Sequence, residues 1–245
     1  LPLLALSPLL VLETGVGAHV DAFVTLAVAA ALLAFDARRP GLVGLALGLG
    51  VTIKLLPGIA LVALAVATSR RAAARMIAVA AGAVGLVYAI AMALGLRPPG
   101  SLSVFFEKWR NGSPLFTALD VYLSGPMLPL ALVGIALLLL AFAARIARLK
   151  PMDGVQIALA VPLLVSPVTF PWYLSALVPA MAVSPSALVI CWLTAVPLTY
   201  EVRDRFAVDG TWTPAVWPLF AIALAWLAGF VIDRARTRVR VSSAR

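Results

Sequence analysis

Long apolar stretches separated by short polar segments run along almost the whole chain. At roughly 20 apolar residues per helical crossing, the pattern predicts membrane helices at Asp21–Phe35, which is short, and at Met76–Leu96, Pro126–Ala144, Val155–Phe170 and Pro214–Ile232. Two further blocks, Gly41–Thr68 and Trp172–Thr199, have 28 residues each, which is too long for one upright crossing and short for two.

Each of these two blocks has proline or glycine near its middle, at Lys54–Gly58 in the first and at Ser184–Ser186 in the second. Such residues break helices, and broken helices are tolerated in a membrane only inside protein or beside a cavity. Each block is therefore predicted to be a short helical hairpin. The whole pattern predicts an all-α, polytopic membrane bundle with about nine passes, counting two for each hairpin.

The distribution of basic residues predicts the orientation of this bundle. Four segments hold 13 of the 19 Lys and Arg residues and only 3 of the 10 acidic residues: Asp36–Pro40, Ser69–Arg75, Arg145–Asp153 and Asp233–Arg245. Cytoplasmic loops carry an excess of Lys and Arg, so these segments are expected inside. If each of the two blocks is a hairpin, all four basic segments lie on one side of the membrane. The alternative, in which each block is a single tilted helix, would place several of these segments on the wrong side.

Composition narrows the class of protein. The chain has 245 residues, of which 63% are hydrophobic and 12% are charged, about half the charge of an ordinary soluble domain at about 25%. A soluble enzyme and a nucleic-acid-binding domain are therefore excluded, and the net charge of +9 is assigned to cytoplasmic loops. A single cysteine, Cys191, and a single histidine, His19, exclude a cysteine or multi-histidine metal cage within the chain.

The chain is predicted to be one transmembrane domain over residues 1–245, with a basic cytoplasmic tail at 233–245. It begins with Leu, and no charged segment precedes its first apolar run. We therefore expect it to begin inside a longer protein.

Polar residues at membrane depth are costly and often functional, and here they converge on the outer side. The segment 13–21 brings Glu13, His19 and Asp21 together with flexible glycines. A histidine beside a carboxylate can orient a phosphate or move a proton. In the alternative interpretation, Asp21 is only the N-cap of the helix that follows.

Lys54 lies alone in an apolar block at the predicted outer bend. Its ammonium group requires an anion, either a carboxylate of Asp21 or Glu13 or the phosphate of a ligand. The alternative is a lysine that extends to the membrane interface.

Two further segments place aromatic and charged residues on the same side. The first contains Glu107, Lys108, Trp109, Arg110 and Asn111; arginine offers a planar fork to phosphate, and an aromatic face suits a sugar ring. The second, residues 166–173, breaks at two prolines and ends in Trp172 and Tyr173, which predicts a rigid rim. An ordinary belt of interfacial aromatic residues is the alternative for both.

These four constellations, in this order, resemble the GT-C superfamily of integral-membrane glycosyltransferases. The most similar members are bacterial mannosyltransferases of the glycosyltransferase 87 kind, which use polyprenyl-phosphate sugars. The matching residues are Ser7-Pro8, Glu13, Gly17-Ala18-His19-Val20-Asp21, Gly41–Gly48, Ile53–Pro57, Phe106–Asn111 and Pro171-Trp172-Tyr173.

The resemblance implies transfer of a sugar, with mannose favoured, from a polyprenyl-phosphate donor to a hydroxyl of a lipid or glycan at the extracytoplasmic face of the plasma membrane. It implies an acidic catalytic residue in an outer loop after the first membrane helix, upstream of Leu1. Within this chain the catalytic candidates are Asp21 and Glu13. His19, Lys54, Lys108 and Arg110 are candidates for donor phosphate, and Glu107, Trp109, Asn111, Trp172 and Tyr173 are candidates for sugar or acceptor.

Direct displacement at the anomeric carbon would need a base and cationic groups for the departing phosphate, and no metal is required. The expected partners are the lipid bilayer, the lipid-linked donor and the acceptor, with no nucleic acid. Two other functions remain open: a transporter of a small molecule or lipid, and a catalytically silent GT-C subunit.

Overall fold

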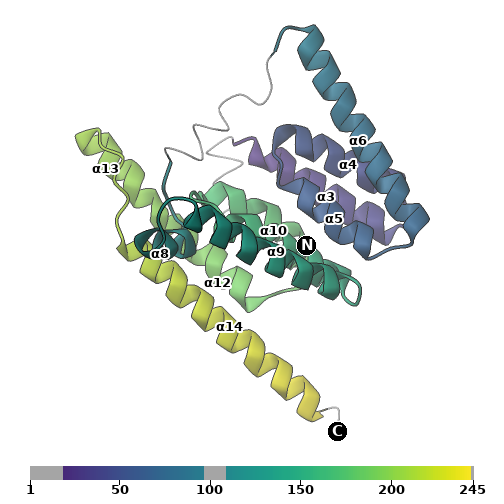
Figure 1. Cartoon of the computed structure of the whole chain (residues 1–245). Helices are drawn as coiled ribbons and strands as arrows, with labels where there is room; N and C mark the ends of the chain where they lie inside the picture. The colour runs from purple at the N-terminus through teal and green to yellow at the C-terminus, as the bar shows by residue number, and fades with distance from the viewer. Residues whose placement is uncertain (1–18, 97–108, 244–245) are drawn as a thin grey trace.

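The computed structural model describes residues 19–96 and 109–243, the last seven of these by their backbone alone, and all of the regular structure in those ranges is helical (Figure 1). The helices of the first half are α3 (Asp21–Asp36), α4 (Pro40–Ile53), α5 (Pro57–Val66) and α6 (Arg70–Ala93). Those of the second half are α8 (Pro114–Tyr122), α9 (Met127–Ala147), α10 (Pro151–Val165), η2 (Pro171–Leu177), α11 (Val178–Val183), α12 (Ala187–Ala195), η3 (Val196–Tyr200), α13 (Glu201–Asp209) and α14 (Trp217–Ser243).

Proline sets the start of several helices. Pro40, Pro57, Pro114 and Pro151 each occupy the first turn of a helix, where the missing N–H would have no partner in any case and the fixed φ is already helical. These residues explain why the apolar blocks divide where they do.

Both predicted helix breaks are confirmed. In the first block α4 ends at Ile53, Lys54 has extended backbone (φ −149°, ψ 147°), and α5 begins at Pro57. In the second block α11 ends at Val183 and α12 begins at Ala187. The two 3-10 segments of the second block, η2 and η3, were not predicted from the sequence.

Among the described residues, three helices are long and apolar enough to cross a membrane: α6, α9 and residues Trp217–Arg236 of α14. The shorter apolar helices include α4, α5 and α10. At 1.5 Å per residue, the 14 residues of α4 extend about 21 Å, which is less than the roughly 30 Å hydrocarbon core. The part of the chain that the structure describes is an all-helical membrane protein, and nine passes remain a prediction.

Close packing between helices depends on glycine. A Cβ on Gly44 of α4 would lie 2.2 Å from the carbonyl oxygen of Met76, and one on Gly48 would lie 2.8 Å from Cα of Ala80. The two glycines are four residues apart and so share one face of α4, which lies directly on α6 (Figure 1). Small residues at this spacing let membrane helices approach closely.

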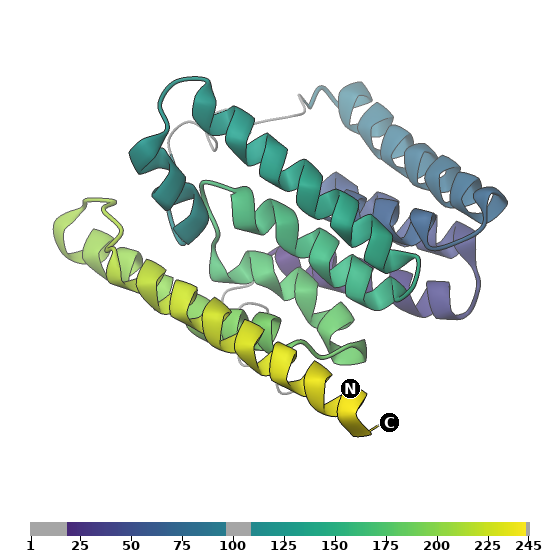
Figure 2. The same ribbon diagram turned by 60° about the horizontal axis from the view of Figure 1, so that its bottom comes forward.

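Close helix packing in the second half of the chain also depends on glycine. A Cβ on Gly154 of α10 would lie 2.3 Å from Cβ of Ala147 on α9, and one on Gly229 of α14 would lie 2.3 Å from Cα of Leu188 on α12. Figure 2 shows α14 running as one long helix along α12, and α9 running beside α10. The buried core comes mainly from α3, α5, α10 and α12, whereas α6 and α9 leave most of their apolar surface exposed, as contact with lipid requires.

Two carboxylates hold the turn between α11 and α12. Asp233 on α14 accepts hydrogen bonds from Ser186 Oγ (2.9 Å) and from the backbone N–H groups of Ala187 (2.9 Å) and Leu188 (3.1 Å). Asp153 on α10 accepts one from Ser184 Oγ. A carboxylate at the N-terminus of a helix is favourable, and the turn therefore lies at the same end of the bundle as the basic segments that contain Asp153 and Asp233.

We expect Gly44→Ala to lower the free energy of unfolding by about 1–3 kcal/mol, because the new Cβ overlaps the α6 backbone and overpacking forces a shift. The measurement is thermal unfolding of the purified protein in detergent micelles. The matched control is Gly85→Ala on α6, where nothing lies within 4 Å of the new Cβ; it is expected to be neutral or to stabilise by up to about 1 kcal/mol. Equal effects of the two substitutions would contradict close packing at Gly44.

Candidate active site: an ion pair beside an aromatic cluster

An ion pair joins the beginning of α3 to the break after α4. Lys54 Nζ lies 2.5 Å from Asp21 Oδ1, and the two side chains are 28% and 5% exposed, respectively. Of the anions that the sequence left open for Lys54, the structure shows the Asp21 carboxylate. The alternative interpretation of Asp21 as an N-cap is wrong: the N-cap residue is Val20, and no side chain caps this helix.

The ion pair also contacts η2. The Lys54 ammonium lies 3.8 Å from the centroid of the Tyr173 ring, at a distance where the ring face attracts a cation. A buried hydrogen bond of 2.9 Å from Thr25 Oγ1 of α3 to Ser175 Oγ attaches η2 to α3. Three chain segments, α3, the α4–α5 break and η2, therefore fix the position of Lys54.

Seven aromatic side chains, here named the aromatic cluster, lie beside the ion pair: His19, Trp109, Phe170, Trp172, Tyr173, Tyr200 and Trp212. Trp172 is central, because the rings of His19 (4.1 Å between centroids) and Phe170 (4.4 Å) both stack on it. Trp109 makes edge contacts with Phe170 at 5.9 Å and with Trp212 at 5.2 Å. Such edge and stacked geometries are the favourable ones for aromatic pairs.

A short backbone bridge holds the segment after Trp109 against residues 167–169. The Asn111 N–H donates to the Pro167 carbonyl (3.2 Å), and the Thr169 N–H donates to the Asn111 carbonyl (2.8 Å). Gly112 follows with φ +65°, and a Cβ there would lie 2.3 Å from the Thr169 carbonyl oxygen. Only glycine fits this conformation and this close approach.

Three buried polar groups near this bridge have no hydrogen-bond partner among the described residues. They are Asn111 Nδ2, Ser113 Oγ and Trp212 Nε1, and the first two belong to side chains of residues that are only 6% and 2% exposed. A buried donor without a partner costs about 1–3 kcal/mol. A ligand rich in hydroxyl groups could supply these partners.

The predicted site residues therefore divide into three groups. The structure brings together His19, Asp21, Lys54, Trp109, Asn111, Trp172 and Tyr173. Arg110 directs its guanidinium to α8, 4.9 Å from the Phe116 ring, and donates to the Trp109 carbonyl (2.8 Å). Glu13, Glu107 and Lys108 lie outside the described residues.

Sequence reasoning missed several residues of the site: Phe170, Tyr200 and Trp212 as members of the cluster, and Thr25 and Ser175 as the link between α3 and η2. A signal exists for Trp212, because the orientation that the basic segments predict places residues 200–213 on the outer side. Charges alternate along residues 201–205, a pattern typical of solvated or internally paired surface, and Glu201 pairs with Arg205 at 2.9 Å. Within the described part of the chain, no three His, Cys, Asp or Glu residues are grouped to hold a metal.

The fold and the site define a polytopic membrane protein with a buried ion pair and a large aromatic surface at one end of its bundle. A model of glycosyltransferase family 87 matches residues 1–167, more than half of the chain, and the protein belongs to this family of membrane glycosyltransferases. No curated protein and no solved structure matches the chain. The matched range contains Asp21, Lys54 and Asn111 and ends before Trp172 and Tyr173.

We expect Lys54→Met to lower the free energy of unfolding by about 1–3 kcal/mol, because it leaves the buried Asp21 carboxylate without its partner. The double variant Asp21→Asn with Lys54→Met is expected to recover most of this loss, since it removes both charges. Thermal unfolding in micelles measures each variant.

The matched control for this experiment is Lys150→Met, which removes a lysine 4.0 Å from Asp153 in an exposed pair. It is expected to change stability by less than about 1 kcal/mol. If the double variant were no more stable than Lys54→Met, the coupling of the two charges would be absent.

Proposed function

We propose that this protein transfers a hexose, with mannose favoured by the family resemblance, from a polyprenyl-phosphate donor to a hydroxyl group of a lipid or glycan. The proposed site is the ion pair and the aromatic cluster, at the extracytoplasmic face of the plasma membrane. The observation that carries the proposal is the Lys54–Asp21 pair beside the Trp172 and Tyr173 rings. It combines a cation for phosphate with aromatic faces for a sugar.

Lys54 is suited to the donor phosphate. An ammonium group has three N–H donors, and the hydrogen bond to Asp21 Oδ1 uses one of them. The side chain is 28% exposed, so a phosphate oxygen can approach it without disrupting the helices. His19, stacked on Trp172, is proposed as a second phosphate contact, and Lys108 and Arg110 as further cations of the same loop region.

The aromatic cluster is suited to the sugar and the acceptor. Trp109 and Trp172 are proposed to pack on the apolar face of the sugar ring. The unpartnered amide of Asn111 would hydrogen-bond to a sugar hydroxyl, with Glu107 from the preceding segment. Apolar faces beside buried polar groups are what a polyhydroxylated ring requires.

The proposed reaction is a single displacement. The acceptor hydroxyl oxygen forms a bond to the anomeric carbon, and the bond between that carbon and the phosphate oxygen breaks. The acceptor proton passes to a carboxylate, with Asp21 and Glu13 as the candidates within this chain. The electron pair leaves with the polyprenyl phosphate, whose charge Lys54 stabilises.

Lys54→Ala is expected to lower sugar transfer by about 100- to 1,000-fold, the range for loss of one group that stabilises developing charge. Asp21→Asn is expected to lower it by about 100- to 10,000-fold. The measurement is incorporation of radiolabelled sugar from polyprenyl-phosphate donors in membranes that contain the full-length protein, with several sugars tested in parallel.

The control for these variants is Arg205→Ala, which removes a half-exposed cation paired with Glu201 on α13 and should leave transfer unchanged. Protein levels in the membranes are compared by immunoblot. Transfer at the wild-type rate in both Lys54→Ala and Asp21→Asn, at normal protein levels, would overturn the proposed site.

The proposed orientation predicts which ends of the bundle are accessible from outside the cell. In a background with Cys191→Ser, a cysteine at the exposed Thr213 position should react with a membrane-impermeant maleimide in intact cells. A cysteine at the exposed Arg71 position, at the start of α6, should react only after permeabilisation. Reaction of both positions from the same side would refute the orientation.

A further inference from the structure

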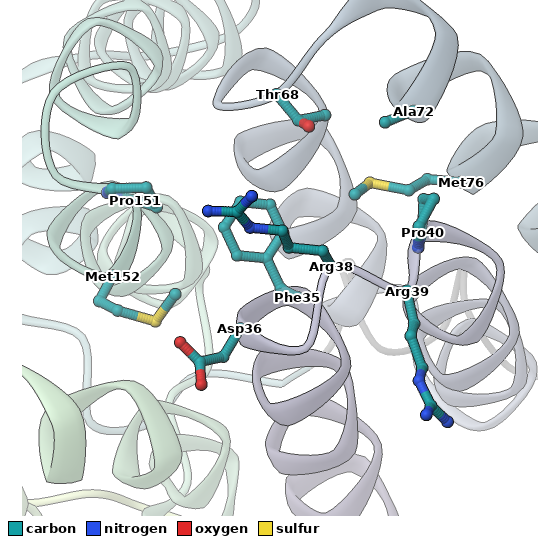
Figure 3. Close-up of a pocket in the computed structure, with 10 residues that line it drawn as sticks. All are labelled: Phe35, Asp36, Arg38, Arg39, Pro40, Thr68, Ala72, Met76, Pro151 and Met152. Carbon is teal, nitrogen blue, oxygen red and sulfur yellow. The ribbon is translucent and has the colours of Figure 1, made fainter.

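A cleft of about 510 Å³ opens at the end of the bundle opposite the ion pair. It lies where α3 ends and α4 begins, between the end of α5 and the starts of α6 and α10 (Figure 3). Asp21 lies at the start of α3, and the cleft lies at its other end. The 16 residues of α3 therefore separate the ion pair from the cleft by about 24 Å. The cleft is therefore not part of the proposed transferase site.

The cleft combines apolar side chains with charged ones, and one of these is the Arg38 guanidinium. Phe35, Met76 and Met152 supply apolar surface. In the view of Figure 3 the Arg38 guanidinium points toward Pro151, and the Asp36 carboxylate points in a different direction. No hydrogen bond or ion pair of the Arg38 side chain is found among the described residues.

The backbone of Arg38 is unusual. Its φ is +54°, the only positive φ of a non-glycine residue in the described part of the chain. The Arg39 N–H donates to the Ala34 carbonyl and the Arg38 N–H to the Phe35 carbonyl, which is the Schellman arrangement at a helix C-terminus. Glycine normally takes the left-handed position, because a side chain there is strained by about 1–2 kcal/mol.

An arginine in a position that favours glycine suggests that its side chain is needed. The local backbone would be satisfied by glycine, so helix termination does not explain the residue. Arg39 lines the cleft as well, and the Arg75 side chain lies across the first turn of α4, 3.4 Å from where a Cβ on Gly41 would be. Arg38 and Arg39 line a cleft that has one carboxylate among its lining residues, that of Asp36. Arg75 lies beside the cleft, and the Arg39 guanidinium points away from Arg38 in Figure 3, so Arg38 is the cation most directly placed at the cleft.

We propose that this cleft binds the phosphate group of an anionic lipid headgroup, with Arg38 as its principal ligand. A guanidinium donates two parallel hydrogen bonds to phosphate, and the apolar walls would pack on the glycerol and upper acyl carbons. Basic sites between helices at the cytoplasmic side are suited to anionic headgroups. A soluble phosphate ester shares this chemistry and is distinguished below.

The test compares Arg38→Gly with wild type. Glycine removes the guanidinium and relieves the strained backbone, so the variant should be as stable as wild type or more stable in lipid-free micelles. The full-length protein is titrated with phosphatidylglycerol or phosphatidylcholine in micelles, and bound lipid is counted by native mass spectrometry. Phosphatidylglycerol should bind wild type, and its affinity for the Arg38→Gly variant should be lower by about tenfold or more.

The matched control is Arg148→Ala, which removes an exposed arginine beyond the end of α9 and should retain wild-type affinity. Glycerol 3-phosphate is tested separately. If it binds wild type but not Arg38→Gly, and the lipid does not bind, the ligand of the cleft is a soluble phosphate ester instead of a lipid. Equal retention of phosphatidylglycerol by wild type and Arg38→Gly, or equal binding of the two lipids by wild type, overturns the proposal.

Discussion

The contact between Lys54 and Asp21 is the constraint on which the arrangement of the first half depends. A carboxylate that is 5% exposed must have a partner, because an unpaired buried charge is strongly unfavourable. That partner can reach it only if α4 ends at Ile53 and the chain becomes extended at Lys54. The helix break and the ion pair therefore depend on each other. Proline and glycine permit the break, and the Asp21 carboxylate fixes the position of Lys54.

The bundle separates two ends with different chemistry. At one end lie the ion pair and the aromatic cluster; at the other lie the carboxylates of Asp153 and Asp233, which hold the turn between α11 and α12, and the cleft around Arg38. Glycine contacts between α4 and α6, α9 and α10, and α12 and α14 keep the helices between these ends close. Such packing gives each end a fixed scaffold, which a site built from several short segments requires.

How much of this could be predicted from the sequence depends on the range of the interaction. Proline and glycine act locally, so the two helix breaks could be predicted. An isolated lysine in an apolar block indicated an anionic partner, but left open whether that partner is a carboxylate or a ligand phosphate. The sequence indicated the side on which Trp212 lies, but the ring contacts of Trp212 and Tyr200 could not be predicted, because contacts between distant segments depend on how η2, η3 and the segment before α14 pack. Asp21 was open to two interpretations because both place a carboxylate at a helix start; the structure distinguishes them by the cap position, which Val20 occupies, and by the tertiary position of Lys54.

The 3-10 conformation of η2 connects the two parts of the site. With three residues per turn, neighbouring side chains point about 120° apart. Trp172 therefore meets the rings of His19 and Phe170, while Tyr173 lies over the Lys54 ammonium. Adjacent residues thus contact the sugar-binding and phosphate-binding parts of the proposed site, and the buried Thr25–Ser175 hydrogen bond fixes both relative to α3. Any change in the winding of η2 would move both parts of the proposed site together, although η2 lies outside the region matched by the family.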